Sequence, residues 1–249
     1  ASASSGYADM TSTVQDALET ALHEPGDTGL ASKLHDFWAA WQNVANHPTD
    51  PSAAGVLLEA ATTLSSRIAQ GYNDAVSTFS ATRSQAQGMV VQVNALATQV
   101  AQLNDQIRQA TAAGQSPNEM LDQRARLTNS LANLTGATVV DRADGSADVL
   151  VGGNPLVTGN KTHTLVLTGA AIMNDANTLP VQLEWANSPG RSAELTGGAL
   201  AAAVGALAPG SASGGGSILS AADTYNALAT QLATQVNAIH RTGATSTGE

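Results

Sequence analysis

The chain of 249 residues is poor in several residue types, and each scarcity narrows what it can do. It has no cysteine, which excludes disulfides, thiolate nucleophiles and zinc–thiolate sites. Only 3% of its residues are aromatic although 43% are hydrophobic, so the core consists mainly of small and aliphatic side chains. Such a core suits close-packed helices better than a sandwich or a deep ligand pocket. We therefore expect a mainly helical protein.

Charge is also scarce, at 12% of the residues, and the net charge at pH 7 is −10. An acidic chain repels phosphate, so nucleic acid and anionic membrane surfaces are not expected as partners. No apolar run approaches the roughly 18 residues of a membrane span, and we expect no cleaved signal peptide. The first residue is not methionine, which indicates a piece of a longer protein.

The longest stretch without proline, Ser52 to Ala113, carries the strongest signal, and Asp50 and Pro51 before it are a typical N-cap and first helical residue. Apolar residues recur there at heptad spacing in two runs: Leu57, Ala61, Leu64, Ile68, Gly71 and Ala75, then Met89, Val93, Leu96, Val100, Leu103, Ile107 and Ala110. We predict one long helix over 52–113, with Gly71 and Gly88 as the places where it would bend or divide. The seams are either sealed within the chain or shared with neighbouring subunits.

Two shorter helices are expected before it, over about 7–24 and 30–45. The second places most of the aromatic mass of the chain, Phe37, Trp38 and Trp41, on one apolar face. Trp38 and Trp41 could form an interaction patch, but burial in the core is the favoured interpretation.

A polar stretch, GQSPNEMLDQRARL at 114–127, follows the long helix and could be either a site or a turn. Its candidate side chains are Asn118, Glu119, Asp122, Arg124 and Arg126. Gly114 is a natural C-terminal cap, and Ser116, Pro117 and Glu119 fit a capping box with Ser116 as N-cap. Asp122 precedes Arg126 by four residues, the favourable order for an ion pair. We interpret the stretch as a helical hairpin at 114–117 that starts a new helix.

From Gly136 onward the apolar period changes from about 3.6 to 2, and Asp144-Gly145 is a strong hairpin signal. Residues 137–187 read as a small β unit of four or so strands, and 162–167 and 179–185 are among the candidates. A short helix over 198–208, a glycine-rich linker over 209–217 and a returning helix over 218–240 follow. The predicted fold is an elongated helical bundle or rod, mainly α, with an inserted antiparallel β subdomain. The expected domains are a discontinuous helical one (1–136 and 194–243), the β subdomain (137–193) and a tail (244–249).

No pattern of catalytic or ligand residues stands out. The histidines, His23, His35, His47, His163 and His240, do not form a metal-binding motif. Asp141, Asp144 and Asp148 flank the hairpin turn at the wrong spacing for a calcium loop. There is no serine elbow and no phosphate-binding loop. We predict no catalytic, cofactor-binding or metal-binding residues, no cofactor and no enzyme activity.

Five blocks, in order, resemble the family of the first hook-associated protein of bacterial flagella: LHDFWAAWQNVANHPTDPSAAGVLLEAATTLSSRI (34–68), VNALATQVAQLNDQI (93–107), PNEMLDQRARLTNSLANLTGATVV (117–140), ADGSADVLVGGNPLVTG (143–159) and LATQLATQVNAIHRTG (228–243). The resemblance implies an α-rich rod with smaller β parts, as a structural protein at the junction between hook and filament. The family's terminal polymerisation segments are absent, so the chain resembles a core fragment, expected to be monomeric alone. Ala125 replaces an aspartate of the family motif.

The resemblance also implies partners and a location. These are the hook protein, the adjoining junction protein or filament subunits, and an export chaperone, with the protein placed outside the cell in the flagellum. Alternatives are another axial protein, such as flagellin or the second junction protein, or a surface adhesion or coiled-coil binding module.

Overall fold

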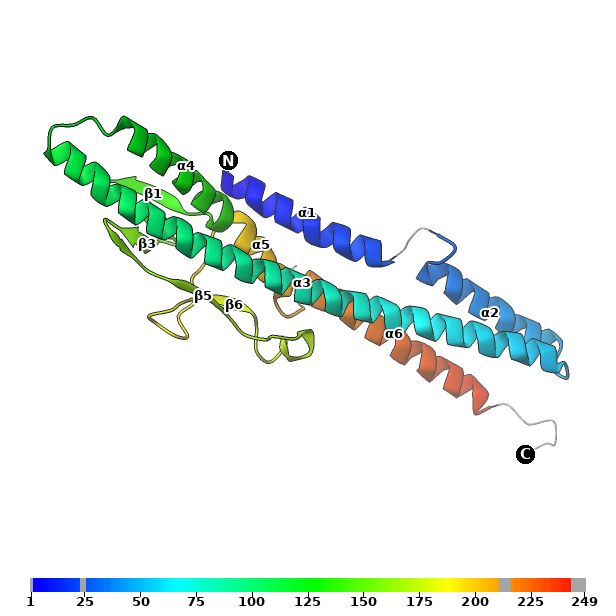
Figure 1. Cartoon of the computed structure of the whole chain (residues 1–249). Coiled ribbons are helices and arrows are strands. Elements are labelled where there is room, and N and C mark those ends of the chain that lie inside the picture. The colour runs from blue at the N-terminus through cyan, green and yellow to red at the C-terminus, as the bar shows by residue number, and fades with distance from the viewer. Residues whose placement is uncertain (1, 23–25, 211–215, 243–249) are drawn as a thin grey trace. The chain divides into compact units, whose positions relative to one another are not determined.

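The computed structural model describes residues 2–22, 26–210 and 216–242, and within them the chain is mainly helical (Figure 1). The six α-helices of this described part are α1 (Ser2–Leu22), α2 (Leu30–Asn46), α3 (Pro51–Ala112), α4 (Asn118–Thr135), α5 (Gly198–Leu207) and α6 (Ser217–His240). The strands are β1 (Thr138–Asp141), β2 (Ala147–Val151), β3 (Asn154–Thr158), β4 (Lys161–Thr162), β5 (Leu165–Thr168) and β6 (Gln182–Trp185), with one 3-10 turn, η1 (Met173–Asp175). This confirms the predicted class, mainly α with an inserted antiparallel β part.

Contacts divide the chain into two compact units. The first comprises residues 1–15 and 79–217, and the second comprises residues 16–78 and 218–249. Both α1 and α3 contribute residues to each unit. The predicted division at 137 and 193, and the tail at 244–249, stay predictions; the tail and part of the 209–217 linker lie outside the described residues.

Helix α3 confirms the prediction of one long helix, since its 62 residues are unbroken. Asp50 caps it as expected, because its Oδ1 accepts the Ser52 N–H at 2.8 Å. The prediction that Gly71 or Gly88 would divide the helix is wrong. Gly88 is exposed with open space around it, whereas Gly71 is buried against the ring of Tyr225. The glycine at position 71 therefore serves close packing and not a break.

In the turn after α3, the predicted C-terminal cap at Gly114 is confirmed, but the next helix begins differently from the prediction. Gly114 has a φ of +72°, Gln115 N donates to Ala110 O at 2.9 Å, and Gly114 N donates to Thr111 O at 3.0 Å. This pair of bonds is a Schellman cap. The predicted capping box is wrong, because α4 begins at Asn118 and Pro117 itself is the N-cap without a side-chain bond. The Leu121 N–H closes on the Pro117 carbonyl, so Ser116 lies one residue too early.

The β residues form two sheets and not one. β1-β2-β3-β4 is an antiparallel meander, and β5 pairs with β6 alone. The Asp144-Gly145 hairpin is confirmed, with Gly145 at φ +85° and Asp141 opposite Ala147. The single strand expected over 162–167 is wrong: the chain breaks at 163–164, ending β4 in one sheet and starting β5 in the other.

The first unit has its core between helices and sheets. Side chains at most 2% exposed come from α3, α4, α5 and the strands: Val93, Val100, Ile107, Leu131, Val149, Val157, Leu165, Leu183 and Leu200. Within this unit α4 runs back along the second half of α3, as Figure 1 shows. The second unit has a smaller core, described next. No helix among the described residues is both long and apolar enough to span a bilayer.

Candidate interaction groove

The second unit is built on an apolar cluster that is only partly covered. Phe37 of α2, Leu64 and Ile68 of α3 and Tyr225 of α6 are buried, at 7% exposure or less. Partly buried hydrophobic residues pack around them: Leu30, Leu34, Trp38, Trp41, Leu57, Ala60, Ala61, Tyr72, Leu228, Leu232 and Val236. The half-covered residues greatly outnumber the buried ones, so much apolar surface of this unit still faces water.

The apolar seam of helix α6 becomes more exposed to solvent toward the C-terminus. Its heptad seam begins buried, at Ile218, Ala222 and Tyr225. Toward the C-terminus the same seam is half-buried at Val236 and 48% exposed at Ile239. A helix with an apolar stripe normally buries it against a neighbour. Among the described residues the stripe is therefore only partly covered at Val236 and largely uncovered at Ile239.

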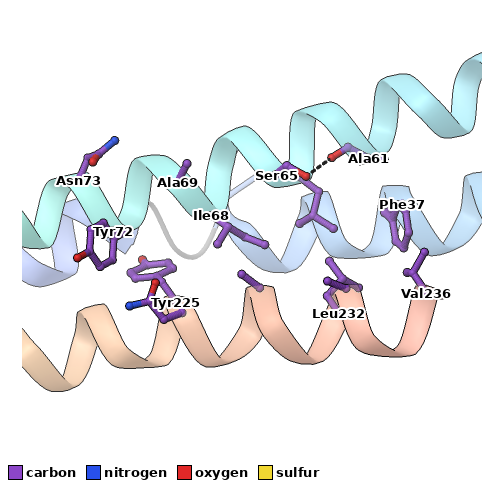
Figure 2. A pocket seen from close by; sticks show the side chains of 14 residues that line it. Phe37, Ala61, Ser65, Ile68, Ala69, Tyr72, Asn73, Tyr225, Leu232 and Val236 are labelled. Atoms are coloured by element: carbon purple, nitrogen blue, oxygen red, sulfur yellow. Dashed lines mark hydrogen bonds between the residues drawn. The ribbon is translucent and has the colours of Figure 1, made fainter. Parts of the chain in front are cut away.

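A groove of about 490 Å³ lies between α3 and α6, with Phe37 of α2 at its wall (Figure 2). Its lining is Phe37, Ala61, Leu64, Ser65, Ile68, Ala69, Tyr72, Asn73, Tyr225, Asn226, Ala229, Leu232, Ala233 and Val236. Figure 2 shows Ile68 and Tyr225 reaching from the two helices toward one another. Small alanines on both walls leave room for another backbone to approach closely.

The chemistry of the groove is apolar. Its lining contains no histidine, aspartate, glutamate, lysine or arginine. The Ser65 hydroxyl is already used, since it donates to the Ala61 carbonyl at 2.8 Å, the dashed line in Figure 2. The ionisable side chains among the lining residues are the phenols of Tyr72 and Tyr225, and no carboxylate, imidazole, ammonium or guanidinium group accompanies them, so the groove is suited mainly to binding apolar side chains.

The aromatic residues of α2 lie at the edge of this cluster. Ring centroids are 5.1 Å apart for Phe37 and Trp38 and 6.3 Å apart for Trp38 and Trp41. Phe37 is buried, whereas both tryptophans are half-buried. Trp38 and Trp41 thus combine both interpretations: part of each side chain packs on the core, and the rest is accessible to a partner.

The polar stretch 114–127 does not gather into a site. Asn118, Glu119, Asp122 and Arg126 are all exposed, and no ion pair joins Asp122 to Arg126, so the pair predicted there is wrong. Arg124 points inward instead and is 8% exposed. Nothing in the local sequence distinguishes Arg124 from Arg126.

Arg124 joins three segments of the first unit. Its Nη1 donates to Asn104 Oδ1 at 3.0 Å and to the Gly145 carbonyl at 2.7 Å. Its Nη2 reaches Asp141 Oδ1 at 3.3 Å. The guanidinium therefore ties α4 to α3 and to the β1–β2 hairpin, a structural role.

The acidic residues of the hairpin are also structural. Asp144 Oδ1 accepts the Ser146 hydroxyl at 2.6 Å and the Ser146 N–H at 3.0 Å, and these bonds lower the pKa of Asp144. Asp148 accepts the Gly159 N–H at 3.1 Å and pairs with Arg142. Each carboxylate thus braces a turn.

Glu184, which no sequence motif marked, also accepts hydrogen bonds that stabilise a turn. Glu184 of β6 is 8% exposed and accepts bonds from the Gly190 N–H at 2.8 Å, the Thr168 hydroxyl at 2.9 Å and the Gln182 amide at 2.7 Å. The pKa of Glu184 is lowered, first by the Gly190 bond and then by the Thr168 bond. Alternation around 182–185 would place Glu184 on the face opposite Leu183 and Trp185, so no signal in the sequence indicated that this side chain is buried.

The histidines do not converge on a metal site in the part of the chain that the structure describes. His35, His47 and His240 are exposed, and His163 lies edge-on to Trp185 with centroids 6.4 Å apart. His23 lies outside the described residues. Within the described ranges no group of three or more His, Asp or Glu side chains could hold a metal ion. The absence of catalytic and ligand residues stays a prediction.

Comparisons with known proteins agree on one family. The family model described as "Flagellar hook-associated protein FlgK helical domain" matches residues 15–249. The chain is 29% identical over 136 residues to flagellar hook-associated protein 1 of Bacillus subtilis (strain 168), covering 55% of this chain and 27% of that protein. It is 30% identical over 148 residues to flagellar hook-associated protein 1 of Escherichia coli (strain K12), covering 55% of this chain and 26% of that protein.

A solved structure gives the same result. The flagellar hook junction protein FlgK from Burkholderia pseudomallei superimposes with a TM-score of 0.68 at 30% identity, covering 83% of this chain and 38% of that chain. The matches thus span about a quarter of the length of the curated relatives and somewhat more of the solved one.

Proposed function

The chain belongs to the family of the flagellar hook-associated protein FlgK helical domain, and from this premise we propose that it is a structural part of the junction connecting the flagellar hook to the filament. The observation that carries the proposal is the open groove of the second unit, whose lining is mainly apolar and contains no carboxylate, imidazole, ammonium or guanidinium group. Such a surface supports packing against other protein and not catalysis, so we propose no enzyme activity.

The partners we propose are the hook protein and the adjoining junction protein or filament subunits. The family membership supports interaction with other axial components of the flagellum. We further propose that the protein is exported to the outside of the cell without a cleaved signal peptide, with help from a chaperone. The lack of cysteine supports this route, because no disulfide can form during passage.

Within the full-length protein we propose that an amphipathic helix closes the groove. The relatives are several times longer than the part that this chain matches, and we propose that a segment outside that part supplies the helix in a protein of their length. Its apolar face would meet Leu232 and Val236 of α6, and the small residues Ala229 and Ala233 would admit its backbone.

Cysteine accessibility tests the closing helix, because this chain has no cysteine of its own. Ala233→Cys should react rapidly with a maleimide in the present chain and at least tenfold more slowly in the full-length protein. Gln106→Cys, on an exposed position of α3 in the other unit, is the control and should react alike in both. Equal rates for Ala233→Cys in the two proteins would refute the closing helix.

Immunogold electron microscopy of intact cells, with antibody raised against this chain, tests the junction role. Label confined to the narrow zone where hook meets filament is expected. Label along the whole filament would indicate flagellin, and label over the cell body would support the adhesion alternative.

A further inference from the structure

Helix α3 holds the β residues of the first unit through side chains that bond to backbone. Asn94 is one of them: its Oδ1 accepts the Leu165 N–H at 2.9 Å and its Nδ2 donates to the Leu165 carbonyl at 2.9 Å. Because β5 pairs only with β6, its other edge is open, and the amide of Asn94 takes the place of a neighbouring strand there. Arg83 acts similarly on the next loop, with Nε donating to the Ala170 carbonyl at 2.6 Å.

Asn104 of α3 likewise bonds through its side-chain amide to the backbone of the four-stranded sheet. It is 1% exposed, and its Oδ1 accepts the Ala147 N–H at 3.0 Å while its Nδ2 donates to the carbonyls of Ala147 and Gly159, both at 2.7 Å. β2 pairs with β3 only from Val149 onward, so the backbone of Ala147 depends on Asn104. Arg124 completes the set by donating to Asn104 Oδ1. Every bonding position of this buried amide is used.

The apolar residues of α3 do not define one axial position by themselves. They repeat every seven residues, as Val93, Val100 and Ile107 do, and all three are at most 1% exposed. Apolar burial is non-directional, so a partner moved along the helix by one heptad, roughly 10 Å at about 1.5 Å per residue, meets similar side chains. In coiled coils a single buried asparagine removes this degeneracy.

A shift by seven residues would leave the two sheets without these bonds. Ala147 and Gly159 would then face Ala97 in one direction or Thr111 in the other. Leu165 would face Gln87 in the first direction and Ala101 in the second. In either direction one of the two sheets meets an alanine, which offers neither donor nor acceptor, so buried N–H and C=O groups of that sheet would be left unpaired, which is strongly unfavourable.

We propose that Asn94 and Asn104 are positioning residues that fix the register of the two β-sheets along α3, each by pairing its side-chain amide with the backbone of one sheet. Asn94 and Asn104 lie ten residues apart, about 15 Å along the helix. The hydrogen bonds of the two asparagines thereby prevent the sheets from sliding along α3, whereas the apolar seam keeps the sheets packed against the helix. This inference goes beyond the junction role and does not depend on it.

Pulsed electron paramagnetic resonance on the whole chain measures the register directly. One pair of spin labels, at Gln85→Cys on α3 and Lys161→Cys on β4, reports the four-stranded sheet; both positions are exposed. Gln85 lies 19 residues before Asn104, so the labels are separated by about 28 Å along the helix. A second pair, Ala112→Cys and Ala186→Cys, reports the two-stranded sheet.

The unsubstituted background should give one narrow distance for each pair. Asn94→Ala combined with Asn104→Ala should broaden both distributions or add a population displaced by up to about 10 Å. Val100→Ala, which truncates a seam residue, is the matched control: it should lower stability and leave both distances unchanged. One narrow, unshifted distance for both pairs in the double variant would overturn the proposal.

Single substitutions keep the test decisive if the double variant does not fold. Asn104→Ala should then disturb the Gln85–Lys161 distance more than the other pair, and Asn94→Ala should disturb the Ala112–Ala186 distance more. Unshifted distances in both single variants would overturn the register role and leave only a contribution to stability.

Discussion

Gly71 offers the sharpest test of how the second unit packs. A Cβ added there would lie 2.7 Å from Tyr225 Oη, with two ring carbons closer still, and Tyr225 is only 6% exposed. Overpacking a core by one carbon costs about 1–3 kcal/mol, whereas alanine in place of glycine inside a helix gains about 0.5–1 kcal/mol. Gly71→Ala should therefore destabilise the chain by roughly 1–2 kcal/mol.

Gly88→Ala is the matched control, because nothing lies within 4 Å of the added Cβ. It sits in the same helix and should stabilise by about 0.5–1 kcal/mol, the helix propensity alone. The changes in the free energy of unfolding should then have opposite signs and differ by about 1.5–3 kcal/mol.

Urea unfolding followed by tryptophan fluorescence and by circular dichroism measures both. Trp38 and Trp41 lie in the same unit as Gly71 and Trp185 in the other, so separate transitions would also be visible. In a Tyr225→Ala background Gly71→Ala should no longer destabilise, since the ring is gone. If Gly71→Ala stabilises as much as Gly88→Ala, the packing argument is refuted.

Three further predictions concern the polar network, pH and association. Arg124→Met should cost about 1–3 kcal/mol in urea unfolding because it removes the partner of the Gly145 carbonyl, while Arg126→Met, on an exposed position, should change stability by less than about 0.5 kcal/mol; equal effects would contradict the structural role of Arg124. The pKa of Glu184 is lowered in the folded chain, so its contribution to stability is present above its ordinary pKa of 4.5 and is lost as the pH falls below that through the folded value. Glu184→Gln should accordingly flatten the fall of Tm between about pH 5 and pH 3, and an unchanged slope would contradict this. The chain alone should have the mass of a monomer, 25.1 kDa, in light scattering, and a mass twice as large would contradict this.

The sequence alone determined what depends on near neighbours. The unbroken α3, its Asp50 cap, the Gly114 turn and the Asp144-Gly145 hairpin all follow from residues within a few positions of each other, since propensity, period and turn chemistry act over that range. The absence of an obvious catalytic motif was also a property of the sequence alone.

Only the tertiary structure decided which of several equivalent residues turns inward. Arg124 and Arg126 are two positions apart on one helix, and nothing local says that the first meets Asn104 and Gly145. Gly71 and Gly88 look alike in sequence, and Tyr225, more than 150 residues later in the chain, makes one indispensable to packing. The partial burial of the groove residues also could not be predicted from the heptad pattern, because apolar residues recur every seven positions whether or not a neighbouring segment buries them. Contacts between distant segments carry this information, and no period or propensity within one segment encodes it.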